Sequence, residues 1–334
     1  QVENLMKHFE VASHGKRAVL RAVDGVSFDL WKGETLGVVG ESGCGKSTLA
    51  RVVVGLETPT GGTVRSGGRE IRAAGKPARG QRSEFQMVFQ NPAGSMNPRR
   101  SVGASIAEPL LAQGVRNCND KVAEMLTKVG LNPGFASRRP HQLSGGQQQR
   151  ASIARALIAK PSLVVHDESI ASLDISLQAQ ILNLLLDLQQ EFGTSYLFIS
   201  HDLAAVQTIS HRIIVMYLGE VVEATTAREF ARQTFHPYSY SLRSATLLPD
   251  PERERARSTV LLKGDVPSPL DPPAACRFHT RCPLAADICR TEKPALRQMA
   301  PDHFAACHFP QEAAALAQGA EGAQGGGGAA EEVT

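Results

Sequence analysis

A glycine-rich stretch near the start of the chain constrains the fold more than any other feature. Residues 40–48 read Gly-Glu-Ser-Gly-Cys-Gly-Lys-Ser-Thr and satisfy the pattern G-x-x-x-x-G-K-[ST]. Glycines let backbone N–H groups curve around phosphates, the lysine places a cation on the β- and γ-phosphates, and the next hydroxyl ligates Mg²⁺. A chance turn can match this pattern, but a strand is predicted before it and a helix after it. The stretch therefore predicts a nucleotide-phosphate site.

Hydrophobic patterning predicts an α/β protein around this loop. Apolar and β-branched runs predict strands at residues 20–30, 36–39, 163–166, 196–200 and 213–217, the first two joined by a turn at 31–34. Helical periodicity predicts helices at 46–54, 147–159 and 176–192, and a helical insertion over 102–139. Residues 61–84, rich in Gly and Arg, predict an antiparallel β subdomain. Such alternation is typical of a mostly parallel sheet.

The composition changes along the chain and predicts three parts. After Leu247 Pro and Arg recur, and four of the six cysteines lie between Cys276 and Cys307. Beyond Pro310 the chain is Ala, Gly, Gln and Glu without a basic residue, which is too little apolar surface to order a segment. The prediction is a domain over 1–247, a small Cys-rich extension over 248–310 and a disordered tail over 311–334.

The charge balance and the apolar runs exclude several classes of protein. The 36 Lys and Arg nearly balance the 33 Asp and Glu, and stacking aromatic residues are few, so a nucleic-acid or redox module ranks last. No apolar run approaches the roughly 20 residues that cross a bilayer, and the chain shows no signal-peptide pattern. These features predict a cytosolic location, where cysteines are more often free, catalytic or metal-bound than paired.

Two adjacent acids end the apolar run Leu163-Val-Val-His-Asp167-Glu168. Acids at the carboxyl end of a parallel strand lie where doubly wound folds bind ligands. Asp167 can then complete the Mg²⁺ shell, while Glu168 faces the γ-phosphate as a base for water. A pair of turn or capping acids after a strand is an equally good reading of these residues alone.

A third motif, Leu143-Ser-Gly-Gly-Gln-Gln-Gln-Arg150, stands between these two sites. By itself it is a capped helix start with Ser144 at the N-cap and Gln147 at N3. In this order with the other sites, it is very similar to the LSGGQ signature of ABC ATPases. The chain over about residues 1–245 resembles an ABC cassette, a P-loop ATPase with an antiparallel β subdomain and a helical insertion.

Further motifs carry the same resemblance. Gln90, in Phe85-Gln-Met-Val-Phe-Gln-Asn-Pro, matches the Q-loop glutamine, and Asp174, in Ser-Leu-Asp, matches the D-loop. His201, after the strand at 196–200, matches the switch histidine on the γ-phosphate. Phe9 lies where the family stacks an aromatic ring on adenine. Alone, a histidine there is more often a capping or core residue, and a Phe near a strand is usually core.

The resemblance implies an ATPase that uses ATP and Mg²⁺. It assigns catalysis to Glu168, His201 and Gln90, and Mg²⁺ to Ser47, Gln90 and Asp167. The implied ATP-binding residues are Phe9, Gly40, Ser42, Gly43, Cys44, Gly45, Lys46, Ser47 and Thr48. Two cassettes pack head to tail in this family, so Ser144, Gly145, Gly146 and Gln147 close over the partner's ATP with the free N–H groups of a helix start. His166 and Ser169 depart from the family pattern, but neither replaces a catalytic group.

The C-terminal part narrows the branch. Phe235-His-Pro-Tyr238 and residues 266–273 resemble the extension of the dipeptide, oligopeptide and nickel importer ATPases, and residues 262–268 look closer to the F-type than to the D-type subunit. This implies import of peptides or a related small solute. The implied partners are a second, D-type ATPase subunit, two transmembrane permease subunits and an extracytoplasmic solute-binding protein, with this chain peripheral on the cytoplasmic face of the inner membrane. The alternative is a soluble ABC ATPase in translation or DNA repair.

Four cysteines follow the pattern Cys276-x5-Cys282-x6-Cys289-x17-Cys307. Four thiols in a Pro-rich segment with little core of its own suggest a metal staple, for which tetrahedral zinc competes with an iron–sulfur cluster. The resemblance implies a four-iron four-sulfur cluster, which some members hold in this extension. Unligated cysteines are the third reading.

Overall fold

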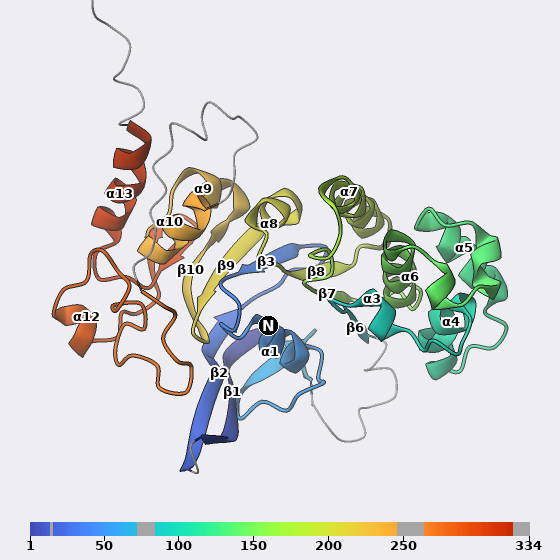
Figure 1. Cartoon of the computed structure of the whole chain (residues 1–334), viewed down its shortest axis with the longest axis horizontal. Helices are drawn as coiled ribbons and strands as arrows, with labels where there is room; N and C mark the ends of the chain where they lie inside the picture. The colour runs from blue at the N-terminus through green and yellow to red at the C-terminus, as the bar shows by residue number, and fades with distance from the viewer. Residues whose placement is uncertain (14–15, 72–83, 246–263, 323–334) are drawn as a thin grey trace, which may run out of the picture.

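The main sheet of the protein is mostly parallel, as the alternation of elements predicts. The computed structural model describes residues 1–13, 16–71, 84–245 and 264–322. In these ranges the strand order of the sheet is β11-β12-β10-β9-β3-β8-β7-β6, and the five strands from β9 to β6 are parallel (Figure 1). The strands are β3 (Thr35–Val39), β6 (Phe85–Val88), β7 (Leu163–Asp167), β8 (Ser195–Ile199), β9 (Arg212–Tyr217), β10 (Glu220–Thr226), β11 (Arg297–Ala300) and β12 (His303–Ala305).

Both faces of this sheet are covered, which explains why its central strands are almost wholly apolar. Alternate residues of β8 enter two cores: Tyr196 and Phe198 face one, and Leu197 and Ile199 face the other. One core contains α7 (Ile175–Phe192), α8 (Leu203–Ile209) and the helical region. The other contains α1 (Lys46–Val53) and the antiparallel sheet. Strands buried on both faces read as continuous apolar runs.

A second, antiparallel sheet has the order β2-β1-β4-β5. Its strands are β1 (Val2–Ser13), β2 (Lys16–Phe28), β4 (Gly61–Ser66) and β5 (Arg69–Glu70). The predicted turn is present, since Glu34 donates its N–H to the Trp31 carbonyl at 3.0 Å. However, it joins β2 to β3 across two different sheets and makes no hairpin. The antiparallel prediction for 61–84 is confirmed up to Glu70, and residues 72–83 lie outside the described ranges.

The helical insertion predicted over 102–139 is confirmed by α4 (Val102–Ala112), α5 (Asn119–Lys128) and the short helix η1 (Pro133–Ser137). In the structure this helical region also includes α3 (Pro92–Ser95), the short helix η2 (Pro140–Gln142) and α6 (Gly145–Leu157), the last of which is the separate helix predicted at 147–159. Its apolar face packs through Ile106, Leu126 and Ile153, which are fully buried. This region lies at the β6 edge of the sheet, far from the C-terminal helices in Figure 1.

The C-terminal part shares the main sheet instead of packing apart from it. After α9 (Ala227–Arg232) and α10 (Pro237–Ser244), residues of β12 pair with β10, as Glu223 opposite Ala305. Phe278, 1% exposed, packs into the main core. The expected boundary at 247 falls within 246–263, outside the described ranges. The short helix α12 (Ile288–Thr291) lies at the outer end of this part (Figure 1).

The prediction of a disordered tail is wrong for its first part. Helix α13 runs from Pro310 to Gly322 and contacts α10. Ala313 and Ala314 are 0% and 4% exposed, and Ala314 packs with Phe235 and Ala305. Burial of these alanines against Phe235 and Ala305 removes apolar surface from water, which stabilises the docked helix. Residues 323–334 lie outside the described ranges.

Candidate functional site

The phosphate loop lies between β3 and α1, as predicted, and its glycines are required by close backbone contacts. Gly45 has φ 106° and immediately precedes α1, and a Cβ there would lie 1.9 Å from the Ala22 carbonyl oxygen. Gly40 has φ 155°, and a Cβ there would lie 2.3 Å from the Met216 carbonyl oxygen. Any larger residue would push the loop away from β2 or β9. The loop shape therefore depends on two strands that the pattern itself does not contain.

Lys46 lies inside this loop and is only 4% exposed. Its ammonium donates to the carbonyl oxygens of Gly40 at 2.7 Å and Glu41 at 3.0 Å. A buried cation with two neutral acceptors keeps its charge available to an anion in the loop. The neighbouring Cys44 is buried as well, and burial raises the pKa of its thiol, so Cys44 is a loop-filling residue and not a nucleophile.

The acids at the end of β7 meet the loop and two distant side chains. Ser47 donates its hydroxyl to Asp167 at 2.8 Å. Glu168 accepts a hydrogen bond from the Gln90 amide at 3.0 Å and lies 3.6 Å from Nδ1 of His201. Glu168 adopts φ 49°, and its N–H donates to the Ile199 carbonyl at 2.9 Å. The strained turn directs the carboxylate away from β8 and towards Gln90 and His201.

The electrostatic environment of Asp167 suits a site for a cation. Burial raises the pKa of Asp167, with a contribution from the Glu168 charge, although the Ser47 hydroxyl and the nearby Arg51 and Lys46 oppose the rise. Such a carboxyl releases desolvation free energy when a cation arrives beside it. Ser47 contacts Asp167, and Gln90 contacts the adjacent Glu168, so the three predicted Mg²⁺ ligands belong to one chain of neighbouring side chains.

The signature begins a helix but lies outside this cluster. Ser144 accepts from the Gln147 N–H at 3.4 Å, and the Gln147 side chain accepts from the Ser144 N–H at 3.1 Å. This is the predicted capping box at the start of α6. Ser144 and Gly145 are exposed, and Gly146 is buried against Leu177 of α7. Asp174 caps α7 by accepting from the Leu177 N–H at 2.9 Å, and Ile175 beside it is 85% exposed.

Phe9, a predicted ATP contact, and His166, a departure from the family pattern, both pack against neighbouring side chains. Phe9 lies half-buried on β1 beneath the Lys7 ammonium, 4.7 Å from its ring centre, and the described contacts do not join it to the loop. His166 is fully buried, and burial lowers its pKa to about 3. Its ring packs on Tyr196 at 4.9 Å, and Ser169 lies 3.4 Å from Nδ1. The departures from the family pattern therefore fill the core behind β7 and leave Asp167 and Glu168 at the site.

The four cysteines lie in one region of the C-terminal part. Burial, with smaller contributions from Cys282, Cys276 and Cys289, raises the pKa of Cys307 to about 12. The Phe309 N–H donates to Cys307 Sγ at 3.4 Å, and the Cys276 N–H donates to the Cys289 carbonyl at 3.2 Å. Within the described ranges, however, no three His, Cys, Asp or Glu side chains form a group that could hold a metal ion.

The structure adds residues to the site that motif reading missed. Tyr238, in the motif that the sequence offered only as a branch marker, accepts a hydrogen bond from the Glu41 N–H at 2.7 Å. Arg281 forms a two-point ion pair with the Glu41 carboxylate. A signal was present, because Arg277 and Arg281 each stand beside a cysteine of the four-cysteine pattern.

Comparisons with known proteins agree with this geometry. Residues 23–171 match the ABC transporter family, and residues 222–289 match the oligopeptide/dipeptide transporter C-terminal region. The oligopeptide transport ATP-binding protein AppF of Bacillus subtilis (strain 168) is 46% identical over 92% of this chain and 96% of its own length. OppF of Escherichia coli (strain K12) is 47% identical over 89% and 92%, and the di/tripeptide transport protein DppF of Pseudomonas aeruginosa (strain UCBPP-PA14) is 46% identical over 92% and 97%.

Solved structures show the same cassette fold. The dimeric post-hydrolysis state of the ATP-binding cassette MJ0796, bound to ADP and Pi, matches 68% of this chain and 98% of its own, with a TM-score of 0.61 and 28% identity. The fold and the site thus define an ABC ATPase, which hydrolyses ATP. The chain belongs to the ATP-binding proteins of the oligopeptide/dipeptide ABC transporter family, and the predicted family and fold are confirmed. Among the described helices, none is long and apolar enough to cross a membrane.

Proposed function

We propose that the chain powers import of peptides, or of a chemically similar small solute, as one ATPase subunit of an ABC transporter. The observation that carries this proposal is the convergence of Ser47, Asp167, Glu168, Gln90 and His201 at one end of the parallel sheet. The names of the relatives, which are oligopeptide and di/tripeptide transport ATP-binding proteins, support peptide import over a soluble ABC ATPase of translation or DNA repair.

In this proposal the residues of the cluster have separate roles in binding the nucleotide, binding the metal ion and activating water. Residues 40–48 cradle the phosphates, Lys46 neutralises them, and Phe9 stacks on adenine. Ser47, Asp167 and Gln90 would hold Mg²⁺, which would offset phosphate charge. Glu168 takes the proton from the attacking water, while His201 donates to the γ-phosphate. The Gln90 amide, 3.0 Å from Glu168, orients the carboxylate and links it to the membrane-facing side.

A single carboxylate tests this assignment. Glu168→Gln should keep ATP affinity and slow hydrolysis by roughly 10²–10⁴-fold, the usual worth of a general base. Steady-state turnover of the assembled transporter and fluorescent-nucleotide binding measure the two quantities. Glu229→Gln, on a partly exposed acid of α9 whose described ion pair is with Arg232, is the matched control and should leave both unchanged. Near-normal turnover of the Glu168 variant would remove Glu168 from the role.

The signature residues 144–147 lie apart from this chain's own phosphate loop, and we expect them to contact the ATP of a partner ATPase subunit of the D-type. The exposed N–H groups at the start of α6 and the exposed Ile175 beside Asp174 support a head-to-tail interface. Ser144→Arg should preserve ATP binding at this chain's own Lys46 site while blocking closure over the partner's nucleotide. Photolabelling of each subunit separates the two sites. Loss of labelling at this chain's own site would contradict the cross-subunit arrangement.

Membrane partners follow from the same assignment. We expect two permease subunits and an extracytoplasmic solute-binding protein, with this chain on the cytoplasmic face of the inner membrane. Phe89, beside Gln90, and Leu111 of α4 are 36% and 47% exposed, so the Q-loop side offers apolar contacts. Pull-down of this chain from solubilised membranes should recover these proteins, and recovery of ribosomes or repair proteins instead would favour the soluble alternative.

The four cysteines are proposed to hold a four-iron four-sulfur cluster, with zinc as the alternative. The clustered thiols and the N–H donated to Cys307 Sγ suit thiolate ligands, which such clusters require. A bound cluster would supply a covalent staple and a redox-active centre. Anaerobically purified protein should be brown, with about four irons per chain. A colourless protein with one zinc, or with no metal, would remove the cluster.

A further inference from the structure

An arginine of the C-terminal extension contacts the phosphate loop. The two terminal nitrogens of Arg281 donate to the two carboxylate oxygens of Glu41 at 2.8 and 3.1 Å. The Arg281 side chain is 8% exposed and that of Glu41 is 27% exposed. This forked geometry is the strong form of an arginine–carboxylate pair, and it joins residues 240 positions apart in the chain.

Glu41 is held at its other polar groups too. Its N–H donates to the Tyr238 hydroxyl at 2.7 Å, and its carbonyl accepts from the Lys46 ammonium at 3.0 Å. The Tyr217 hydroxyl faces the same guanidinium, although it makes no hydrogen bond of good geometry. Arg281 therefore fixes the side chain of the residue whose main chain shapes the loop.

The charge of Glu41 makes this contact matter for nucleotide binding. A carboxylate in a loop that holds a triphosphate repels it, and the repulsion is strong where the site is partly buried. A guanidinium bound to both oxygens cancels that charge and directs the carboxylate away from the phosphates. Without Arg281 the loop would keep Lys46 but would also carry an uncompensated negative charge.

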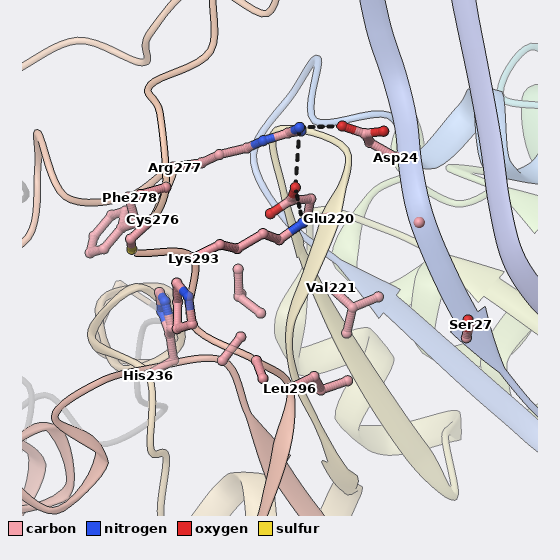
Figure 2. Close-up of a pocket in the computed structure, with 16 residues that line it drawn as sticks. Asp24, Ser27, Glu220, Val221, His236, Cys276, Arg277, Phe278, Lys293 and Leu296 are labelled. Carbon is pink, nitrogen blue, oxygen red and sulfur yellow. Dashed lines mark hydrogen bonds and ion pairs between the residues drawn. The ribbon is translucent and has the colours of Figure 1, made fainter. Parts of the chain in front are cut away.

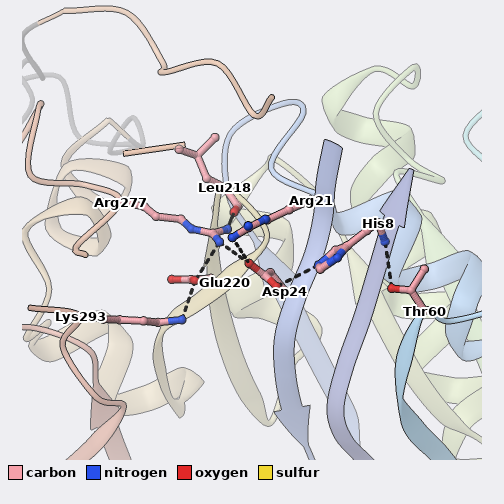
Figure 3. A network of polar contacts seen from close by, with 8 residues as sticks. All are labelled: His8, Arg21, Asp24, Thr60, Leu218, Glu220, Arg277 and Lys293. Atoms are coloured by element: carbon pink, nitrogen blue, oxygen red, sulfur yellow. Dashed lines mark hydrogen bonds and ion pairs between the residues drawn. The ribbon is translucent and has the colours of Figure 1, made fainter. Parts of the chain in front are cut away.

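The segment that carries Arg281 is also held in place by contacts that do not involve Glu41. Phe278 packs edge-on against Tyr217, with ring centres 5.2 Å apart. Arg277 donates to the Leu218 carbonyl, pairs with Asp24, and lies 3.1 Å from Glu220, which also binds Lys293 (Figure 3). Gly219, which follows Leu218 in the chain, donates its N–H to the Cys44 carbonyl of the phosphate loop at 2.8 Å.

A cavity lies behind this anchor. Its volume is about 470 Å³, and Figure 2 shows Cys276, Arg277 and Phe278 on one side of it and Asp24 and Glu220 on the other. Beside this cavity Arg277 of the extension reaches Asp24 of β2 and Glu220 of β10 through ion pairs. Displacement of residues 276–282 would therefore act on the loop through Arg277 and Arg281.

We propose that Arg281 is a positioning residue for the phosphate loop, so that the cysteine-bearing segment 276–282 sets the affinity of the ATP site. This inference rests on the proposed role of residues 40–48 as that site. Arg281 acts through Glu41 and does not itself contact nucleotide. It affects binding of ATP more than the chemical step, because the described side-chain partners of Glu168 are Gln90 and His201 and not this pair.

The test is a mutant cycle on the full chain with fluorescent ATP binding and steady-state kinetics. Arg281→Gln should weaken ATP binding by about 10-fold, the effect of roughly 1.4 kcal/mol, and raise KM with little change in kcat. Arg281→Lys keeps the positive charge but cannot donate to both carboxylate oxygens of Glu41 in the same geometry. Its ATP affinity should therefore lie between those of the wild type and Arg281→Gln. Glu41→Gln combined with Arg281→Gln should recover most of the affinity, because the repulsive charge is gone.

The control is Arg290→Gln, which removes an exposed arginine of the same extension whose ion pair, among the residues that the structure describes, is with Asp287. It should bind ATP like the wild-type chain. Wild-type affinity in Arg281→Gln, or a double variant no tighter than the single one, would overturn the proposal. A wild-type chain that binds no ATP, or binds it equally well after Lys46→Ala, would overturn the proposed function itself.

Discussion

The phosphate-loop region and the segment 276–282 touch at Glu41 and Arg281, yet they are built in opposite ways. Around the loop, the residues that the motifs predict already contact one another, as Ser47 with Asp167 and Gln90 with Glu168. In the segment, Cys276 and Cys282 belong to no group of side chains among the described residues that could hold a metal ion, and arginines that the motifs did not predict make the contacts. The difference teaches that a motif predicts its site best when regular strands and helices hold it.

The largest effect is expected in the phosphate loop, where one added methyl group would collide with the backbone of β2. Gly45→Ala should abolish ATP binding and cost more than about 3 kcal/mol, because its Cβ would meet the Ala22 carbonyl oxygen at a φ that disfavours side chains. Urea unfolding and nucleotide binding measure both effects. Gly43→Ala is the matched control, since it also has positive φ but nothing within 4 Å, and it should cost only about 1–2 kcal/mol. Equal losses would show that the close contact is unimportant.

A smaller loss of stability is expected in the segment 276–282 when Arg277 is replaced. Arg277→Gln removes a partner from Asp24 and Glu220 and should lower the free energy of unfolding by about 1–3 kcal/mol. Burial opposes ionisation of Asp24, but the hydrogen bonds from Arg277 and His8 outweigh it and lower its pKa.

The sign of that shift predicts a pH dependence. A carboxyl whose folded pKa lies below its unfolded value adds stability above the unfolded pKa and loses it as the pH falls through the folded pKa. The gap between wild type and Arg277→Gln should therefore be full near neutral pH and shrink below about pH 4. Denaturant melts across this range measure it, with Arg290→Gln as the control. A gap independent of pH would contradict the role of Asp24.

The smallest effect is expected where the extension ends. Ala313→Glu places a carboxylate at a position that is 0% exposed, so α13 should detach from α10. Because detachment is local, the global loss should stay below about 1 kcal/mol, and ATP affinity should not change. Limited proteolysis reports the exposure of residues 310–322. The neighbouring exposed Ala315→Glu should resist protease like the wild type, and equal cleavage of both would argue against docking.

Local sequence was enough for much of the fold and for the catalytic cluster. The strands β3, β7 and β8 and the helices α1, α6 and α7 follow from apolar runs, periodicity and caps, all of which act within a few residues. The positions of Lys46, Glu168 and the Ser144 cap follow from those elements, since parallel strands bring their carboxyl ends to one edge.

Tertiary structure alone decided the remaining features. The turn at 31–34 could not reveal that β2 and β3 belong to different sheets, because both sheets bury apolar residues alike. The order of α13 depends on a surface made by Phe235 and Ala305, which no property of an alanine-rich segment encodes. The pair of Glu41 and Arg281 requires two loops 240 residues apart to be held in place by separate elements, and such long-range contacts leave no local pattern.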